Sequence, residues 1–191
     1  VLRGAAKGLG NGQPIYPEST WLTGLMQANY DGVAAILMPG VWLSLFLAVL
    51  MFLLLTNTRF GRHVYAIGSN ETAARLCGVH VNRTKLIVYG LAAVLTAIAA
   101  LLQFALLHGQ GNPTTAEGYE LKVIAAALIG GAALSGGEGS IPGTIVGALI
   151  VTVLGNGCAT VGIDSWVQDV AAGGIILAVV AVDRFKHGRE T

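Results

Sequence analysis

The segment of the chain that most invites a chemical interpretation is SGGEGSIPGT, residues 135–144. Its glycines and hydroxyl groups suggest a loop that wraps phosphate. Such a loop needs a lysine before its final Ser or Thr, so that a positive charge reaches the phosphates, and no lysine is present. Pro142 also takes the place of the last glycine in a G-x-G-x-x-G loop beginning at Gly137. We therefore expect this chain to bind neither ATP nor magnesium, and any ATP hydrolysis to belong to a partner.

The rest of the sequence shows no motif for catalysis by a nucleophile or a metal ion. A serine nucleophile needs an adjacent base, and none of the four histidines falls within an apolar block. The two cysteines, Cys77 and Cys158, form no CxxC pair, and no HExxH motif occurs. The net charge of +1 gives no basic field for nucleic acid. The sequence thus predicts a component that is not an enzyme. An intramembrane enzyme and a purely structural membrane scaffold are the alternatives from other classes.

Three amide side chains could bind a neutral substrate that carries several hydroxyl groups. They are Gln103, Asn156 and Gln168. An amide both donates and accepts hydrogen bonds, as the hydroxyl groups of a sugar require. Hydrogen bonds between neighbouring helices are the other interpretation, and the sequence leaves both open.

Long apolar blocks must position these residues. Hydrophobic residues make up 54% of the chain and charged residues only 11%, whereas a soluble domain has about 25% charged residues. Residues 36–55 contain no charge over 20 positions, enough to cross roughly 30 Å of hydrocarbon. We predict an all-α, polytopic transmembrane helix bundle with about five spans, near residues 36–55, 86–107, 120–134, 141–158 and 166–183. The last three blocks are weaker, and tilted or broken helices would suit them.

The polar regions between and beside these spans indicate how the spans are oriented in the membrane. Residues 1–32, rich in glycine and proline, are expected to form an extracytoplasmic loop region, and residues 33–191 the transmembrane region. Residues 56–85 form a polar connection with five Lys or Arg, and three more follow the last block. Cytoplasmic residues are enriched in Lys and Arg. Placing both regions in the cytoplasm puts eight of the eleven Lys and Arg inside, so we expect a cytoplasmic carboxy terminus.

A short helix is predicted within this connection. Asn70 can cap a helix that begins at Glu71, and Gly78 can end it. Glu71 and Arg75 are spaced to pair on one face. By itself, this spacing is typical of an ordinary capped helix in a loop.

The surrounding stretch, GRHVYAIGSNETAARLCGVHVNRTK at residues 61–85, resembles the cytoplasmic loop of bacterial ribose/xylose-type ABC sugar permeases. The shared pattern is Gly-Arg, then Ala-x-Gly-x-Asn-Glu, then Ala-x-Arg-Leu-x-Gly-Val. The resemblance implies a short coupling helix that docks into an apolar groove of the ATPase subunit. The residues expected to couple the chain to that subunit are Gly61, Arg62, Gly68, Asn70, Glu71, Ala73, Ala74, Arg75, Leu76 and Gly78.

A second stretch, residues 118–150, resembles the same family through Gly-Tyr-Glu-Leu, an Ile-Ala-Ala run and a glycine-rich loop. Cys77 and Pro142 depart from the family pattern. The resemblance implies the carboxy-terminal part of a permease subunit, with its amino-terminal half absent, that carries a monosaccharide such as ribose or xylose across the bacterial inner membrane. Branched-chain amino acids or nucleosides are the alternative cargo. The implied partners are an ABC ATPase that holds ATP and magnesium, an extracytoplasmic sugar-binding protein, and a second permease subunit, identical or different.

Glycines recur every four residues in this second stretch. Gly139, Gly143 and Gly147 would lie along one helix face, where two helix backbones can approach closely. Packing within the chain and packing between two permease subunits are both open.

Overall fold

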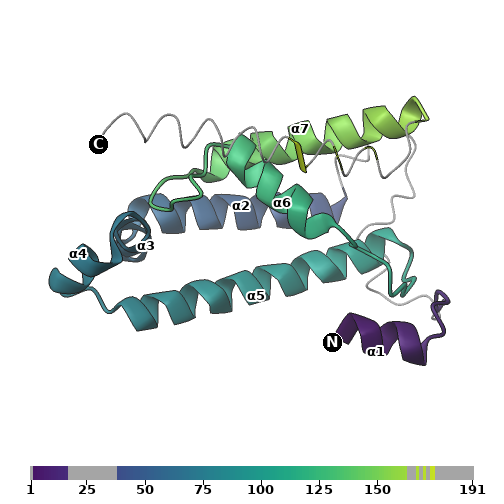
Figure 1. Ribbon diagram of the computed structural model, residues 1–191, viewed down its shortest axis with the longest axis horizontal. Coiled ribbons are helices and arrows are strands. Elements are labelled where there is room, and N and C mark those ends of the chain that lie inside the picture. Colours follow the sequence, from purple (N-terminus) through teal and green to yellow (C-terminus); the bar gives the residue numbers. More distant parts are fainter. Residues whose placement is uncertain (1, 17–37, 163–166, 168–169, 171–172, 175–191) are drawn as a thin grey trace. The chain divides into compact units, whose positions relative to one another are not determined.

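The computed structural model describes residues 2–16, 38–162, 167, 170, 173 and 174. Every named element in these residues is a helix, which confirms the all-α prediction. The elements, shown in Figure 1, are α1 (Leu2–Leu9), α2 (Pro39–Asn57), α3 (Arg59–Ser69), α4 (Glu71–Leu76), α5 (Val81–Leu106), α6 (Tyr119–Ile129) and α7 (Ile141–Thr160).

Three of these helices are long and apolar enough to cross a membrane, namely α2, α5 and α7. Their most apolar windows have mean hydropathies of 2.2, 2.2 and 1.7. At 1.5 Å per residue they extend about 28, 39 and 30 Å, close to or longer than the roughly 30 Å of a bilayer core. They coincide with the spans predicted near residues 36–55, 86–107 and 141–158. The span predicted near residues 166–183 lies almost wholly outside the described residues.

Helix α6 ends earlier than the span predicted over residues 120–134. The N–H groups of Gly131 and Ala132 donate to the carbonyls of Leu128 and Ala127, each at 3.0 Å. Gly131 has a φ of 88°, and this left-handed residue closes the helix end. The remaining 11 residues extend only about 16 Å, roughly half of the hydrocarbon thickness.

The chain divides into two compact units. The first contains Val1–Leu50 and Lys85–Glu117, and the second contains Met51–Thr84 and Gly118–Thr191. In the first unit, Lys7 pairs with Glu117 at 3.5 Å, and Ile15 and Gly111 form an isolated antiparallel bridge. These contacts fix the amino-terminal helix to the loop that follows α5.

The second unit contains more structure in the polar connection than the sequence predicted. One short helix was expected within residues 56–85, and two are present, α3 and α4. Thr58 separates α2 from α3, and its hydroxyl accepts from the N–H of Gly61 at 3.3 Å. A Cβ on Gly61 would overlap the backbone of Leu55, so this sharp turn requires glycine. The first residue of the predicted motif is thereby explained by local packing.

Candidate functional site

Helix α4 has the cap, the end and the ion pair that its sequence predicts. The side-chain oxygen of Asn70 accepts from the N–H of Ala73 at 2.9 Å. At the other end, Gly78 has a φ of 82°, and its N–H donates to the carbonyl of Arg75 at 3.1 Å. Arg75 also pairs with Glu71 at 3.1 Å. The Arg75 and Glu71 side chains are 63% and 43% exposed, so the pair contributes only about 0.3–0.5 kcal/mol. The caps at both ends hold the short helix α4 together.

The side chains of α4 divide between its two faces. Leu76 is 85% exposed, whereas Ala74 is only 6% exposed. Ala74 was expected to enter the groove of a partner together with Ala73 and Leu76. The structure corrects this expectation for Ala74, which packs inside the chain, while Ala73 and Leu76 remain accessible. A leucine this exposed at the tip of a capped helix is a surface that a partner can cover.

The two sequence motifs meet in space within the second unit. We call residues 59–76 the coupling hairpin and residues 135–140 the glycine loop. The hydroxyl of Tyr65 in α3 donates to the carbonyl of Gly139 at 2.9 Å, across 74 residues of sequence. A Cβ on Gly68 would overlap the backbone nitrogen of Gly137. The hairpin and the loop therefore touch backbone to backbone, which no residue larger than glycine at position 68 permits.

The three glycines spaced four residues apart do not all lie on one helix face, although the sequence predicted that they would. Helix α7 begins at Ile141, because the Ser140 hydroxyl accepts from the N–H of Gly143 at 3.1 Å. Pro142 favours the same first turn, where its missing N–H is not needed. Gly139 has a φ of 154° and precedes the helix, so its predicted place on the helix face is wrong. The cap explains the difference, since it fixes the helix start after Gly139.

Gly143 and Gly147 are placed by the structure against α6. A Cβ on Gly143 would overlap the carbonyl of Gly130, and one on Gly147 would overlap the carbonyl of Ala126. Packing within the chain, one of the two interpretations of the series, therefore accounts for these two glycines. The pairings run in opposite directions along the two helices, so α6 and α7 are antiparallel neighbours (Figure 1). Ala125 and Leu128 are also buried in α6.

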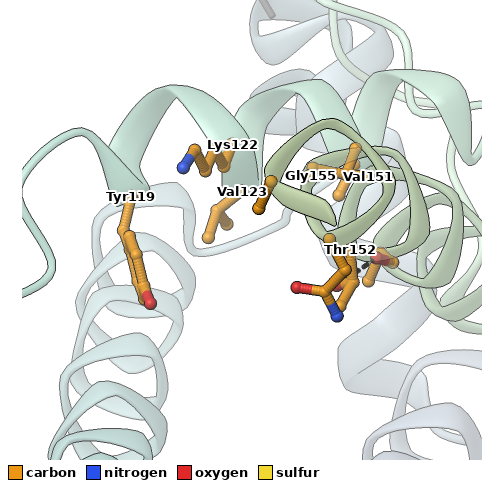
Figure 2. A pocket seen from close by; sticks show the side chains of 10 residues that line it. Tyr119, Lys122, Val123, Val151, Thr152 and Gly155 are labelled. Carbon is orange, nitrogen blue, oxygen red and sulfur yellow. Dashed lines mark hydrogen bonds between the residues drawn. The ribbon is translucent and has the colours of Figure 1, made fainter. Parts of the chain in front are cut away.

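A groove of about 460 Å³ lies between α6 and α7. Tyr119 and Thr152 stand on opposite sides of it, with Val123 and Gly155 between them (Figure 2). The Lys122 ammonium lies 5.8 Å from the centre of the Tyr119 ring. The Thr152 hydroxyl donates to the carbonyl of Ala148 at 2.8 Å. The groove thus combines apolar walls with an aromatic ring, a hydroxyl and a cation.

Of the three predicted path residues, Asn156 lines this groove. Gln103 belongs to α5, in the first compact unit, and Gln168 lies outside the described residues. Sequence reasoning missed Tyr119 and Thr152 as groove residues. Tyr119 stands in the Gly-Tyr-Glu-Leu stretch, which was the available signal, whereas Thr152 sits in an apolar block without one.

Metal ligation has no support in the part of the chain that the structure describes. No group of three or more His, Cys, Asp or Glu side chains lies close enough there to hold an ion.

Comparison with known proteins finds relatives that are named as permease proteins. A family model described as "Branched-chain amino acid transport system / permease component" matches residues 4–180. The ribose import permease protein of Escherichia coli strain K12 is 38% identical over 187 residues, which are 98% of this chain and 58% of that protein. The L-arabinose transport system permease protein of the same strain is 39% identical over 187 residues, 98% of this chain and 56% of that protein. The xylose transport system permease protein of Haemophilus influenzae is 47% identical over 137 residues, 72% of this chain and 36% of that protein.

The chain therefore spans less than three fifths of the length of these curated relatives, at most 58%. No solved structure matches the chain.

Proposed function

Because the chain belongs to the family of permease components of branched-chain amino acid transport systems, we propose that it forms part of the membrane path of an ATP-driven importer. The cargo that we propose is a monosaccharide such as ribose or xylose. Three relatives between 38% and 47% identical carry the names of ribose, arabinose and xylose permeases. They favour a sugar over the branched-chain amino acids of the family description and over nucleosides.

The observation that carries the proposal is the backbone contact between the coupling hairpin and the glycine loop. In this proposal, Leu76 docks on a separate ATPase subunit, which binds ATP and magnesium and performs the hydrolysis. Movement of α4 and α3 then passes through Tyr65 and Gly68 to the α6–α7 pair. Two rigid arrangements of packed helices would give alternating access to the two sides of the membrane. The chain itself performs no hydrolysis.

The proposed membrane location and partners follow from the proposed role as an importer permease. The importer spans the bacterial inner membrane several times, with the coupling hairpin and the carboxy terminus in the cytoplasm. An extracytoplasmic sugar-binding protein delivers the cargo, and a second permease subunit, identical or different, completes the path. Three apolar helices long enough to cross a membrane support this placement.

The docking role of α4 predicts that Leu76→Asp lowers ATPase activity stimulated by the loaded binding protein. A charge placed in an apolar docking groove costs about 2 kcal/mol or more, which corresponds to roughly 30-fold weaker docking. The measurement is ATP hydrolysis by the assembled transporter in proteoliposomes. Leu9→Asp is a matched control, because Leu9 is 91% exposed and lies outside the hairpin. Full stimulation in the Leu76→Asp transporter would exclude this docking role.

The proposed orientation predicts unequal reactivity of the two cysteines. Cys77 is exposed and Cys158 is partly exposed, so accessibility on the chain itself does not prevent modification of Cys77. A membrane-impermeant thiol reagent applied to intact cells should leave Cys77 unmodified in a Cys158→Ser chain. The same reagent should modify Cys77 once the cells are permeabilised. Modification of Cys77 in intact cells would reverse the orientation.

A further inference from the structure

We propose that the open end of the α6–α7 groove, between Tyr119 and Asn156, is a binding site for the monosaccharide as it passes through the permease. This inference rests on the proposed transport of a sugar, and it names the residues of this chain that touch it.

The position of the site follows from the antiparallel arrangement of the two helices. The glycine loop joins the end of α6 to the start of α7, and the residues that line the groove lie toward the opposite, open end of the helix pair. Gly130 faces Gly143 beside the glycine loop. Asn156 lies thirteen positions after Gly143 in α7, which is about 20 Å farther along the helix. The open end therefore faces away from the coupling hairpin, toward the side from which an importer receives its cargo.

The chemistry of the open end suits a neutral sugar. The amide of Asn156 can both donate and accept, and it has no hydrogen-bond partner among the residues that the structure describes. The Thr152 hydroxyl has given its hydrogen to Ala148, so its lone pairs can accept from a sugar hydroxyl. No carboxylate lines the groove. A fixed negative charge, which would select a cation, is thus missing from the described walls.

The aromatic ring supplies the second requirement of sugar binding. A sugar has a face of C–H groups, and such a face packs well against an aromatic ring. Tyr119 stands across the groove from Thr152 (Figure 2). Lys122 lies near this ring and helps to hold it in place by a cation–π interaction. The groove volume of about 460 Å³ falls within the range of roughly 300–1,000 Å³ found for small-molecule sites.

The test uses the assembled transporter with its ATPase and binding protein in proteoliposomes, and D-ribose as the probe. The variants are Asn156→Ala, Asn156→Gln, Tyr119→Leu and Tyr119→Phe. The control is Val153→Ala, because Val153 is 68% exposed and does not line the groove. The measured quantity is the number of ATP molecules hydrolysed for each ribose imported. This ratio separates a lost sugar contact from a general loss of active complex.

We expect the ratio to rise about tenfold in Asn156→Ala and Tyr119→Leu, the scale of one lost hydrogen bond or ring contact. Asn156→Gln and Tyr119→Phe, which keep the amide and the ring, should rise less, and Val153→Ala should match the wild type. An unchanged ratio in Asn156→Ala and Tyr119→Leu would overturn the site. This includes an equal fall of import and hydrolysis, which leaves the ratio unchanged and indicates a loss of active complex. A wild-type complex that imports none of ribose, xylose and arabinose would instead contradict the proposed function.

Discussion

Replacing Gly68 by valine should strongly reduce coupled sugar uptake by the assembled transporter. The new Cβ would overlap the backbone nitrogen of Gly137, and a backbone atom cannot rotate away as a side chain can. Forcing atoms into such a contact costs about 1–3 kcal/mol, and more when the surroundings cannot adjust. The coupling hairpin would then separate from the glycine loop, and the Tyr65 hydrogen bond to Gly139 would be lost. We expect uptake to fall at least about tenfold, measured with labelled ribose in proteoliposomes.

The control for this substitution is Gly90→Ala. Gly90 lies within α5, and a Cβ there would meet nothing within 4 Å. Alanine is preferred over glycine inside a helix by about 1 kcal/mol, so this variant should be as active as the wild type and slightly more stable. Normal uptake in Gly68→Val, with the protein present at the wild-type level, would exclude the backbone contact as the route of coupling.

Replacing Gly147 by valine should have the second large effect, on the stability of the permease. A side chain at this position would overlap the carbonyl of Ala126, and it would push α7 away from α6. Ala126 is itself only 6% exposed, so the space around it cannot take up the new side chain. We expect a loss of about 1–3 kcal/mol in the free energy of unfolding, seen as a lower midpoint temperature when the detergent-purified protein is heated.

Gly157→Ala is the matched control on the same helix. A Cβ at Gly157 meets nothing within 4 Å, so its midpoint should be equal to that of the wild type or higher. If Gly147→Val melted at the same temperature as Gly157→Ala, the close α6–α7 packing would be refuted.

The features that were correctly predicted from the sequence depend on residues close to one another along the chain. The cap at Asn70, the end at Gly78 and the pair of Glu71 with Arg75 each depend on residues within a few positions of one another. The long spans were also predictable, because an uncharged block of 20 residues has few other stable states. These features require no knowledge of the rest of the fold.

The errors arose where a local signal competed with composition. Helix α6 was extended to residue 134 because the segment stays apolar, although Gly130 and Gly131 stop the helix. Gly139 was placed on a helix face because of its four-residue spacing, although Ser140 sets the helix start after it. Helix α3 was missed because it is only 11 residues long and its longest apolar run, residues 64–67, is too short to stand out as a block. In each case, a capping rule was stronger than the hydrophobic pattern.

The contacts that join the two motifs could not be derived from the sequence. Tyr65 and Gly139 are 74 residues apart, and no periodicity relates one to the other. The burial of Ala74 and the groove between α6 and α7 likewise depend on how helices pack, not on the residues of one helix. Such contacts are set by tertiary packing, which overrides local preference.

The central claim is that this chain carries a sugar under the control of a partner ATPase. It is tested most directly by measuring the uptake of labelled ribose, xylose and arabinose into proteoliposomes that contain the assembled transporter. We predict accumulation of at least one pentose that requires both ATP and the ATPase subunit, and that excess leucine or adenosine does not reduce. Uptake that proceeds without ATP, or accumulation of leucine or adenosine with no pentose, would contradict the account.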